Sequence, residues 1–156
     1  MKEKLKGILF FSVIFAVADQ VIKLFLSNKM IVDQSTILIK NLLSITLTHN
    51  TGAAFSIFSG SRYLLIAIAL IAIVALFLYV KNLEVIDDLD IFIYSLLFGG
   101  ILGNLIDRIV YGYVIDYISL SFGNYYFPIF NFADICIVLS IVVMILRTIK
   151  DDLWKE

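Results

Sequence analysis

Four long apolar runs divide the chain, and each is about as long as a helix that crosses a membrane. They cover about 7–26, 63–80, 91–110 and 129–147. A hydrocarbon core about 30 Å thick needs about 20 helical residues to span it. The run at 63–80 contains no charged residue. The pattern therefore predicts four transmembrane helices, with the second facing lipid.

The first run also fits a second interpretation, a cleavable signal peptide. Three lysines lie within 2–6, and the small residues Ala-Val-Ala at 16–18 are typical of a cleavage site. However, the apolar pattern resumes at 21–26, so that the run reaches spanning length. We therefore expect a retained first transmembrane helix.

The two loops on one side of these spans, 27–62 and 111–128, contain patterns typical of strands. Residues 37–40 and 43–48 are rich in β-branched side chains, and 43–48 also alternates with a period of two. A further alternating segment covers 113–121. Alternation of this kind indicates half-buried strands, so these loops predict a small sheet at the membrane surface.

Residues 51–62 are small and aromatic, which suits a short interfacial helix or a mobile flap. The expected fold is an all-α polytopic membrane protein. It has four transmembrane helices, a small extracytoplasmic β-sheet and a short interfacial helix, in a single integral-membrane domain over 1–156.

The composition supports a membrane protein and excludes several kinds of site. Hydrophobic residues make up 62% of the chain and charged residues 16%, whereas soluble domains are about half apolar and about a quarter charged. The net charge of −1 gives no reason to expect a nucleic-acid partner. Cys136 is the only cysteine and His49 the only histidine, which excludes an intramolecular disulfide and a metal site built from Cys and His. We interpret Cys136 as a packing residue and His49 as a surface or sheet residue.

The distribution of lysine and arginine predicts the orientation, because cytoplasmic segments are enriched in both. The loop 27–62 contains only Lys29, Lys40 and Arg62, which is sparse for its length, and 111–128 has no basic residue. Both termini and the 81–90 loop should therefore be cytoplasmic. The basic residues assigned to that side are Lys2, Lys4, Lys6, Lys81, Arg147, Lys150 and Lys155.

Costly polar residues from separate spans reach a similar depth in the outer half of the membrane. At 1.5 Å per helical residue, Asp19 lies about 20 Å and Asn104 about 21 Å from the inner ends of their spans. Asp116 follows the outer end of the third span, and Asp134 lies about one turn inside the outer end of the fourth. This convergence predicts one polar site near the outer leaflet.

Helical spacing suggests partners for some of these charges. Asp19 and Lys23 are four residues apart and share a helix face. Asp107 and Arg108 are adjacent, and we expect both pairs to be structural ion pairs. For Arg108, a role facing the substrate is equally compatible with the pattern. Gly99 and Gly103 form a G-x-x-x-G pattern that allows another helix to approach closely.

Asp116 and Asp134 differ from the other charges because neither has a basic partner at helical spacing. An unpaired acid at membrane depth is a candidate functional group. Two carboxyls brought together share a proton, as in aspartic proteolysis. The alternative is that each caps a helix or faces water.

Four blocks of sequence, at 19–23, 50–55, 99–117 and 130–134, resemble the lipoprotein signal peptidases (signal peptidase II). These bacterial enzymes remove signal peptides from prolipoproteins. The resemblance implies that Asp116 and Asp134 are the catalytic pair. It also implies substrate contacts for five residues, which are Asn50, Gly52, Asn104, Arg108 and Asn131.

The function implied is an intramembrane aspartyl endopeptidase of the bacterial cytoplasmic membrane. It would cleave diacylglyceryl-modified prolipoproteins just before the lipidated cysteine, at an extracytoplasmic active site. It would need no metal or cofactor, contact membrane phospholipid and act as a monomer. A small proton-coupled transporter and a lipid-binding scaffold without chemistry are the alternatives.

Overall fold

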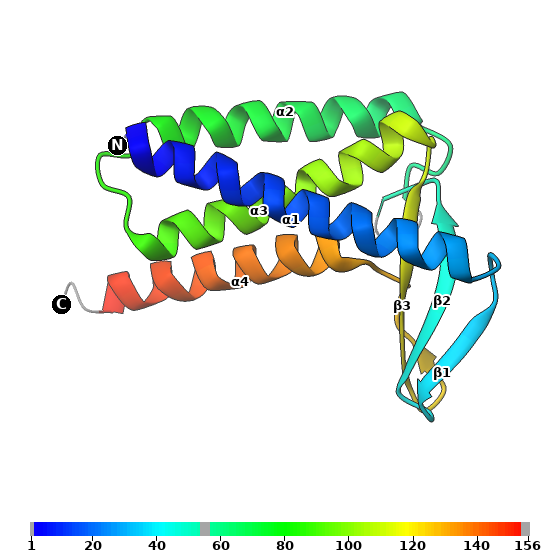
Figure 1. Ribbon diagram of the computed structural model, residues 1–156. Helices are drawn as coiled ribbons and strands as arrows, with labels where there is room; N and C mark the ends of the chain where they lie inside the picture. Colours follow the sequence, from blue (N-terminus) through cyan, green and yellow to red (C-terminus); the bar gives the residue numbers. More distant parts are fainter. Residues whose placement is uncertain (1, 54–56, 154–156) are drawn as a thin grey trace.

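The computed structural model describes residues 2–53 and 57–153, and its helices confirm the four predicted spans (Figure 1). All four helices are long and apolar enough to cross a membrane. Four strands form one sheet, in which neighbouring strands are antiparallel. The elements in chain order are α1 (Lys2–Lys29), β1 (Ser35–Ile39), β2 (Leu43–Asn50), α2 (Arg62–Lys81), α3 (Asp88–Val110), β3 (Val114–Phe122), β4 (Tyr125–Tyr126) and α4 (Phe132–Leu153).

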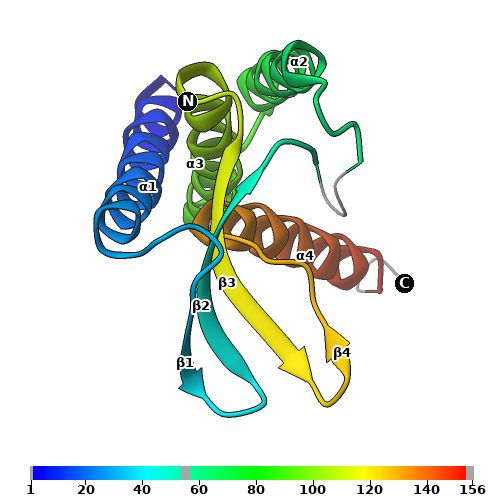
Figure 2. The same ribbon diagram turned by 90° about the vertical axis from the view of Figure 1, so that its right-hand side faces the viewer.

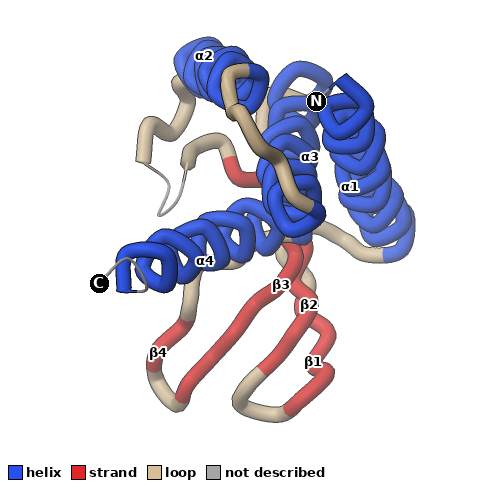
Figure 3. The backbone as a smooth tube through the Cα atoms, turned by 90° about the vertical axis from the view of Figure 1, so that its left-hand side faces the viewer, coloured by secondary structure: helices blue, strands red, loops and turns tan. Residues whose placement is uncertain are grey.

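The helices lie side by side, and the sheet projects from one end of them (Figures 1 and 2). The start of α1 and the end of α4 lie at the opposite end (Figure 1). The strand order is β1-β2-β3-β4, and in Figure 3 most of the sheet lies below the helices. The predicted strands are confirmed as β1, β2 and β3, whereas the two-residue β4 was not predicted.

Helix α3 is the central helix, and its glycines explain why its neighbours come so close. A Cβ atom on Gly99 would lie 2.6 Å from the Cβ of Phe15 in α1. On Gly100 it would lie 2.5 Å from the carbonyl oxygen of Ala133 in α4. Both distances are far below van der Waals contact, so any larger residue would push the helices apart. The predicted close approach at the G-x-x-x-G pattern is confirmed.

Helix α1 is part of the helix assembly, as expected for a retained segment. Its buried residues recur along one face that packs on α3, and they include Ile8, Ser12, Ala16, Asp19 and Lys23. Helix α2 buries only Leu65 and Val80, which agrees with a helix that faces lipid.

The helix ends away from the sheet are joined by charged side chains. The Asp87 side chain accepts from the backbone N–H of Asp90, and the Asp90 side chain accepts from the N–H of Asp87, which forms a capping box at the start of α3. Arg147 of α4 contacts both carboxylates, at 2.9 Å and 2.7 Å. The N–H of Asp90, together with Arg147, lowers the pKa of Asp87.

Two predicted helical segments differ from the structure. Helix α4 begins at Phe132 rather than at 129, because Phe130 bridges to Ile118 of β3 and extends the sheet towards the helix. A short helix in 51–62 is absent from the described residues 51–53 and 57–61, which form bends and turns. The rest of that prediction falls on 54–56, which lie outside the described residues.

Candidate active site

Asp116 lies on β3 and is only 2% exposed. Its Oδ2 accepts a hydrogen bond from the Asn50 side-chain amide at 2.9 Å, and its Oδ1 accepts one from the Asn131 amide at 2.7 Å. Asn50 ends β2, the strand that pairs with β3, while Asn131 directly precedes α4. The carboxylate is therefore fixed between a strand end and a helix start.

Asp134 lies in the first turn of α4 and closes a capping box with Asn131. The backbone N–H of Asn131 donates to Asp134 Oδ2 at 3.1 Å, and the backbone N–H of Asp134 donates to Asn131 Oδ1 at 2.9 Å. This reciprocal pattern satisfies N–H groups that have no partner within the helix. Asp134 therefore does cap a helix, which is the structural role that its position in the sequence left open.

The second oxygen of Asp134 joins the carboxyl to α3. The Asn104 amide donates to Asp134 Oδ1 at 2.8 Å, and Asn104 Oδ1 accepts from the Asn131 amide at 3.0 Å. Asn131 thus contacts both aspartates, since its side chain donates to Asp116 and its backbone to Asp134. Three asparagines together supply a donor to every oxygen of the two carboxyls.

A second buried cluster lies beside this site and contains a cation. Lys23 Nζ lies 2.7 Å from Asp19 Oδ2 and 2.8 Å from Asp107 Oδ2, and all three side chains are at most 1% exposed. The prediction for Asp19 and Lys23 is confirmed. The predicted pair of Asp107 with Arg108 is wrong, because adjacent residues project from a helix about 100° apart. Asp107 faces α1, and Arg108 points elsewhere.

Arg108 reaches the start of the loop between β2 and α2. Its Nη2 donates to the carbonyl oxygen of Gly52 at 3.0 Å, and the N–H of Gly52 donates to Asn50 Oδ1 at 2.9 Å. The Arg108 Nε is buried and has no hydrogen-bond partner within residues 2–53 and 57–153. Arg108 therefore brings a cationic group with an unused donor to the edge of the two aspartates.

Burial is the main influence on the acidity of Asp116, whose pKa it raises to about 6. The hydrogen bond from Asn50 opposes this rise, and the negative charge of Asp134 adds to it. The two carboxyls therefore interact electrostatically. No ion pair forms at either one within the described chain. A proton can thus be held at Asp116 close to neutral pH.

Several residues that support the site were not singled out from the sequence. Gln20 donates to Asp107 Oδ1 at 2.8 Å and to the carbonyl oxygen of Gly103 at 3.1 Å, which ties α1 to α3. Tyr117 accepts from the N–H of Phe132 at 3.1 Å and so holds β3 against the start of α4. Arg62 donates to the carbonyl oxygens of Arg108 and Ile109 at 2.8 Å and 2.6 Å, which caps the end of α3. The polar character of these residues is visible in the sequence, but their partners lie in distant segments.

The cysteine and the histidine lie in the environments predicted from the sequence, a packed helix for Cys136 and the sheet surface for His49. Cys136 is buried, at 2% exposure, one turn or less beyond the capping box of α4. His49 is exposed on β2 and stacks on the ring of Tyr113, with centroids 3.9 Å apart. Neither contacts Asp116 or Asp134 within the described structure.

Comparison with known families and structures gives consistent results over nearly the whole chain. Residues 11–150 match the family described as Signal peptidase (SPase) II. The Lipoprotein signal peptidase of Clostridium acetobutylicum is 38% identical over 136 residues, which are 86% of this chain and 88% of that protein. The protein of the same name from Staphylococcus aureus is 36% identical over 146 residues, 93% of this chain and 89% of its own length.

Two solved structures share the fold. One is described as a bacterial membrane enzyme determined by the in meso method at 2.3 Å. It has a TM-score of 0.88 and 33% identity and covers 96% of this chain and 91% of its own. The other carries the same description at 1.9 Å, with a TM-score of 0.82, 33% identity and coverage of 92% and 93%.

Proposed function

The chain belongs to the signal peptidase II family, and on this premise we propose that it is an aspartyl endopeptidase whose catalytic pair is Asp116 and Asp134. Family membership makes it a multi-pass bacterial membrane protein and a protease that removes signal peptides from prolipoproteins. The finer proposal is that it cleaves diacylglyceryl-modified precursors just before the lipidated cysteine. It acts there without a cofactor.

One observation carries the proposal for the pair. Two carboxyls from different segments are held by the same asparagine, and neither forms an ion pair within the described structure. A carboxylate at this depth is costly to keep unless it is protonated, paired or functional. Asn131, Asn50 and Asn104 donate to the oxygens without fixing the charge of the pair. This is the environment in which two acids share one proton.

The chemistry follows from that shared proton. The ionised carboxyl removes a proton from a water molecule, whose oxygen attacks the scissile carbonyl carbon, while the protonated carboxyl donates to the carbonyl oxygen. When the tetrahedral intermediate breaks down, the C–N bond is cleaved, the protonated carboxyl donates its proton to the amine nitrogen of the cysteine, and the other carboxyl takes a proton from a hydroxyl of the intermediate. The pair then returns to its singly protonated state, and no covalent enzyme intermediate is formed.

Three of the other site residues would act first by positioning the pair. Asn50, Asn104 and Asn131 all direct side-chain amides at a carboxyl oxygen, and Asn131 also provides the cap of α4. Direct contacts of these residues with substrate remain predictions. Asp19, Lys23 and Asp107 are proposed to be structural, since their charges satisfy one another.

Arg108 and Gly52 are the proposed contacts with the substrate backbone. The Arg108 side chain already binds one peptide carbonyl, that of Gly52, and retains an unpaired Nε donor within the described residues. Guanidinium groups bind planar acceptors with several donors at once. A carbonyl of the precursor, held in this way beside Asp116 and Asp134, would be placed for attack.

The proposed location is the extracytoplasmic surface of the cytoplasmic membrane. The candidate site and the sheet lie at one end of the helices, and the start of α1 and the end of α4 lie at the other (Figure 1). With the lysine-rich ends in the cytoplasm, the pair reaches the outer leaflet. A diacylglyceryl group anchored in that leaflet would bring its cysteine to this depth.

A proton-coupled transporter is less well supported by the arrangement of charges. Acids of a relay would extend from one membrane face to the other. In the described structure, the stretch of α3 between Asp90, near one end, and Asn104, at the site end, contains the buried Ser95 but no buried acid. The sequence similarity likewise points to a protease rather than to a carrier.

The test is cleavage by the purified protein of a precursor peptide, with and without a diacylglyceryl thioether on its cysteine. We expect cleavage of the lipidated peptide at the bond before the cysteine, with one oxygen from ¹⁸O-labelled water in the new carboxylate, and no loss of rate with a metal chelator. Mass spectrometry of both products measures each outcome. Equal cleavage of the unmodified peptide, or cleavage at another bond, would contradict the proposed specificity.

A further inference from the structure

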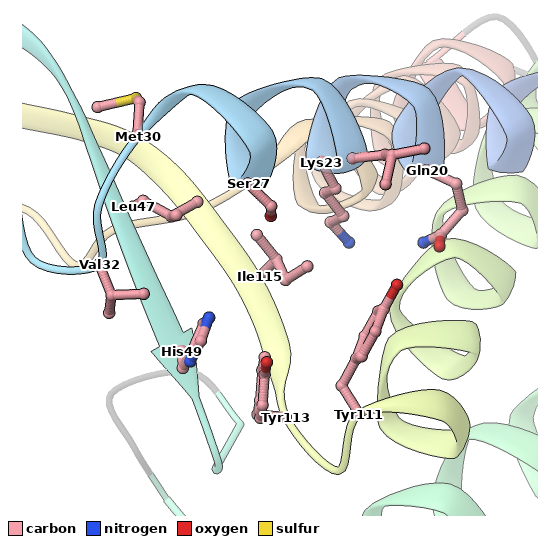
Figure 4. A pocket seen from close by; sticks show the side chains of 11 residues that line it. Gln20, Lys23, Ser27, Met30, Val32, Leu47, His49, Tyr111, Tyr113 and Ile115 are labelled. Carbon is pink, nitrogen blue, oxygen red and sulfur yellow. The ribbon is translucent and has the colours of Figure 1, made fainter.

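A cavity of about 370 Å³ lies between the end of α1 and the strands β2 and β3 (Figure 4). Its wall includes Ile115, the residue before Asp116 on β3. Successive side chains of a strand point to opposite faces. Since Asp116 faces Asn50 and Asn131 on one side, the cavity beside Ile115 occupies the other. It is therefore a second site, which the proposed peptidase reaction does not use.

The cavity wall mixes apolar and polar side chains, and several of the polar groups have no protein partner within the described residues. Ser27 comes from the end of α1, while Tyr111 and Tyr113 come from the segment between α3 and β3 (Figure 4). Within residues 2–53 and 57–153, none of these three hydroxyls forms a protein hydrogen bond, and neither does the imidazole of His49. The rings of His49 and Tyr113 are stacked and so hold each other in place. The cavity thus presents hydrogen-bonding groups that no protein group uses, and those of His49, Tyr111 and Tyr113 belong to stacked rings.

Lys23 is the only lysine or arginine among the described residues of the cavity wall, and it is already paired. Lys23 reaches the cavity, but its ammonium contacts Asp19, Asp107 and Asn104. An ammonium group has three donors, and these contacts use all of them. A ligand would therefore be bound through neutral hydroxyl and imidazole groups rather than through an ion pair.

A second cavity, of about 300 Å³, continues from the first along the helices. Gln20 and Leu24 of α1 line both cavities. Apart from Gln20, the second cavity is lined only by apolar side chains of α1 and α3. Those on α1 that open towards lipid include Val17 and Val21, which are 54% and 59% exposed.

The length of this apolar cavity matches one leaflet of a membrane. Its lining residues on α1 extend from Val13 to Leu24, a distance of about 17 Å at 1.5 Å per residue. Half of a hydrocarbon core about 30 Å thick is about 15 Å. The polar cavity begins where this length ends, at the side of the membrane where the sheet lies.

We propose that the two cavities together bind one glycerophospholipid of the outer leaflet. One acyl chain lies in the groove between α1 and α3, and the glycerol and phosphate groups accept hydrogen bonds from Ser27, Tyr111 and Tyr113. Because no free cation takes part, anionic and zwitterionic head groups should bind with affinities that differ by no more than a few-fold. Binding of this lipid is independent of the chemistry proposed for the aspartates.

The test counts lipids bound to the purified protein by native mass spectrometry. The probes are 1-palmitoyl-2-oleoyl-phosphatidylglycerol and the matching phosphatidylethanolamine, each titrated into the protein in mild detergent. The groove variant is Val17→Trp, which fills the apolar cavity, and the head-group variant is the double change Tyr111→Phe and Tyr113→Phe, which removes only hydroxyls. The control is Ile71→Trp, a similar change on the exposed face of α2, where the side chain is 68% exposed.

We expect one tightly bound lipid of either kind in the wild type, in Ile71→Trp and in Asp116→Asn, and at least tenfold weaker binding in both cavity variants. Far-ultraviolet circular dichroism should show unchanged helix content in all of them. Absence of a retained lipid in the wild type overturns the proposal, as does equal retention in the cavity variants. Weaker binding in Val17→Trp alone would indicate only a surrounding bilayer lipid and would also overturn it. Loss of peptidase activity in Asp116→Asn with normal lipid binding keeps the two proposals distinct.

Discussion

Two pairs of carboxyls lie near the same end of the helices, and they are held in opposite ways. Asp19 and Asp107 share a single ammonium group, that of Lys23. Asp116 and Asp134 share an asparagine instead, which donates to both and carries no charge. Asp19 and Asp107 are each 0% exposed, whereas Asp116 is 2% exposed.

The difference teaches how one fold can keep carboxyls for two purposes. A buried ammonium between two acids favours their ionised forms and ties two helices together. A neutral amide can donate a hydrogen bond to a carboxyl in either charge state, so the carboxyl can gain or lose a proton while it keeps this partner. The first arrangement suits a structural role, and the second suits the acid–base chemistry proposed for Asp116 and Asp134. Substitutions in the two groups should therefore have different effects.

The largest expected effect is on the reaction. Asp116→Asn and Asp134→Asn should each reduce cleavage of a lipidated precursor by about 10⁴-fold, about 5 kcal/mol in the barrier, because either change removes a proton-transfer group. Steady-state cleavage by purified protein measures this loss. Asp33→Asn is the matched control, since Asp33 is exposed in a turn at a φ of 64°, which asparagine also tolerates. Normal cleavage by either site variant would contradict the catalytic role proposed for that aspartate.

The next largest effect is on stability and concerns the ion-paired cluster of Lys23, Asp19 and Asp107. Lys23→Met should lower the free energy of unfolding by about 3–5 kcal/mol, because it leaves two buried carboxylates without their cation. Thermal unfolding in detergent, followed by circular dichroism, measures the change, with the exposed Lys29→Met as control. If Lys23→Met unfolded like the wild type but lost its activity, Lys23 would belong with the reacting groups rather than with the structural ones.

A smaller effect is expected from one of the amides. Asn50→Ala removes the donor to Asp116 Oδ2 and also the acceptor for the N–H of Gly52. A hydrogen bond to a charged group contributes about 2 kcal/mol, so we expect about a tenfold to thirtyfold lower kcat. Asn28→Ala, which changes an exposed amide near the end of α1, should leave kcat unchanged. An effect on KM alone would assign Asn50 to substrate binding instead.

The smallest effect is on how stability depends on pH. Because burial raises the pKa of Asp116 to about 6, the folded protein binds a proton there more readily than the unfolded chain does. The ionised form therefore destabilises the fold above pH 6, and this cost decreases as the pH falls from 6 towards the ordinary aspartate pKa of about 4. Compared with Asp116→Asn, the wild type should gain a few degrees in Tm between pH 8 and pH 5. Parallel Tm profiles for the two proteins would show that this carboxyl does not titrate in that range.

Much of the fold follows from one-dimensional patterns. The length of the apolar runs predicts the four helices, and alternation predicts β1, β2 and β3, because both signals are local. The pair of Asp19 and Lys23 is equally local, since four residues make about one helical turn. The start of α4 was placed three residues early, because Ile129 and Phe130 are as apolar as the helix that follows.

The contacts of the site depend on which helix faces pack against one another. The spacing of residues along the sequence does not determine this packing. Asp107 was assigned to its neighbour Arg108, whereas the packing of α1 on α3 gives it to Lys23. Gln20 and Tyr117 were not singled out, since each acts on a segment far away in sequence. The resemblance to a family supplied the residues of the candidate site. The structure adds which amide contacts which carboxyl oxygen.

The loop between β2 and α2 is anchored at both ends to one turn of α3. At its start the carbonyl of Gly52 accepts from Arg108, and at its end Arg62 donates to the backbone carbonyl of that same Arg108. In polymer terms these bonds fix the end-to-end distance of the segment. Each doubling of a loop's length then costs only about 0.6 kcal/mol of closure entropy. The number and type of residues between the anchors can therefore change at little cost in stability while the two aspartates stay where they are.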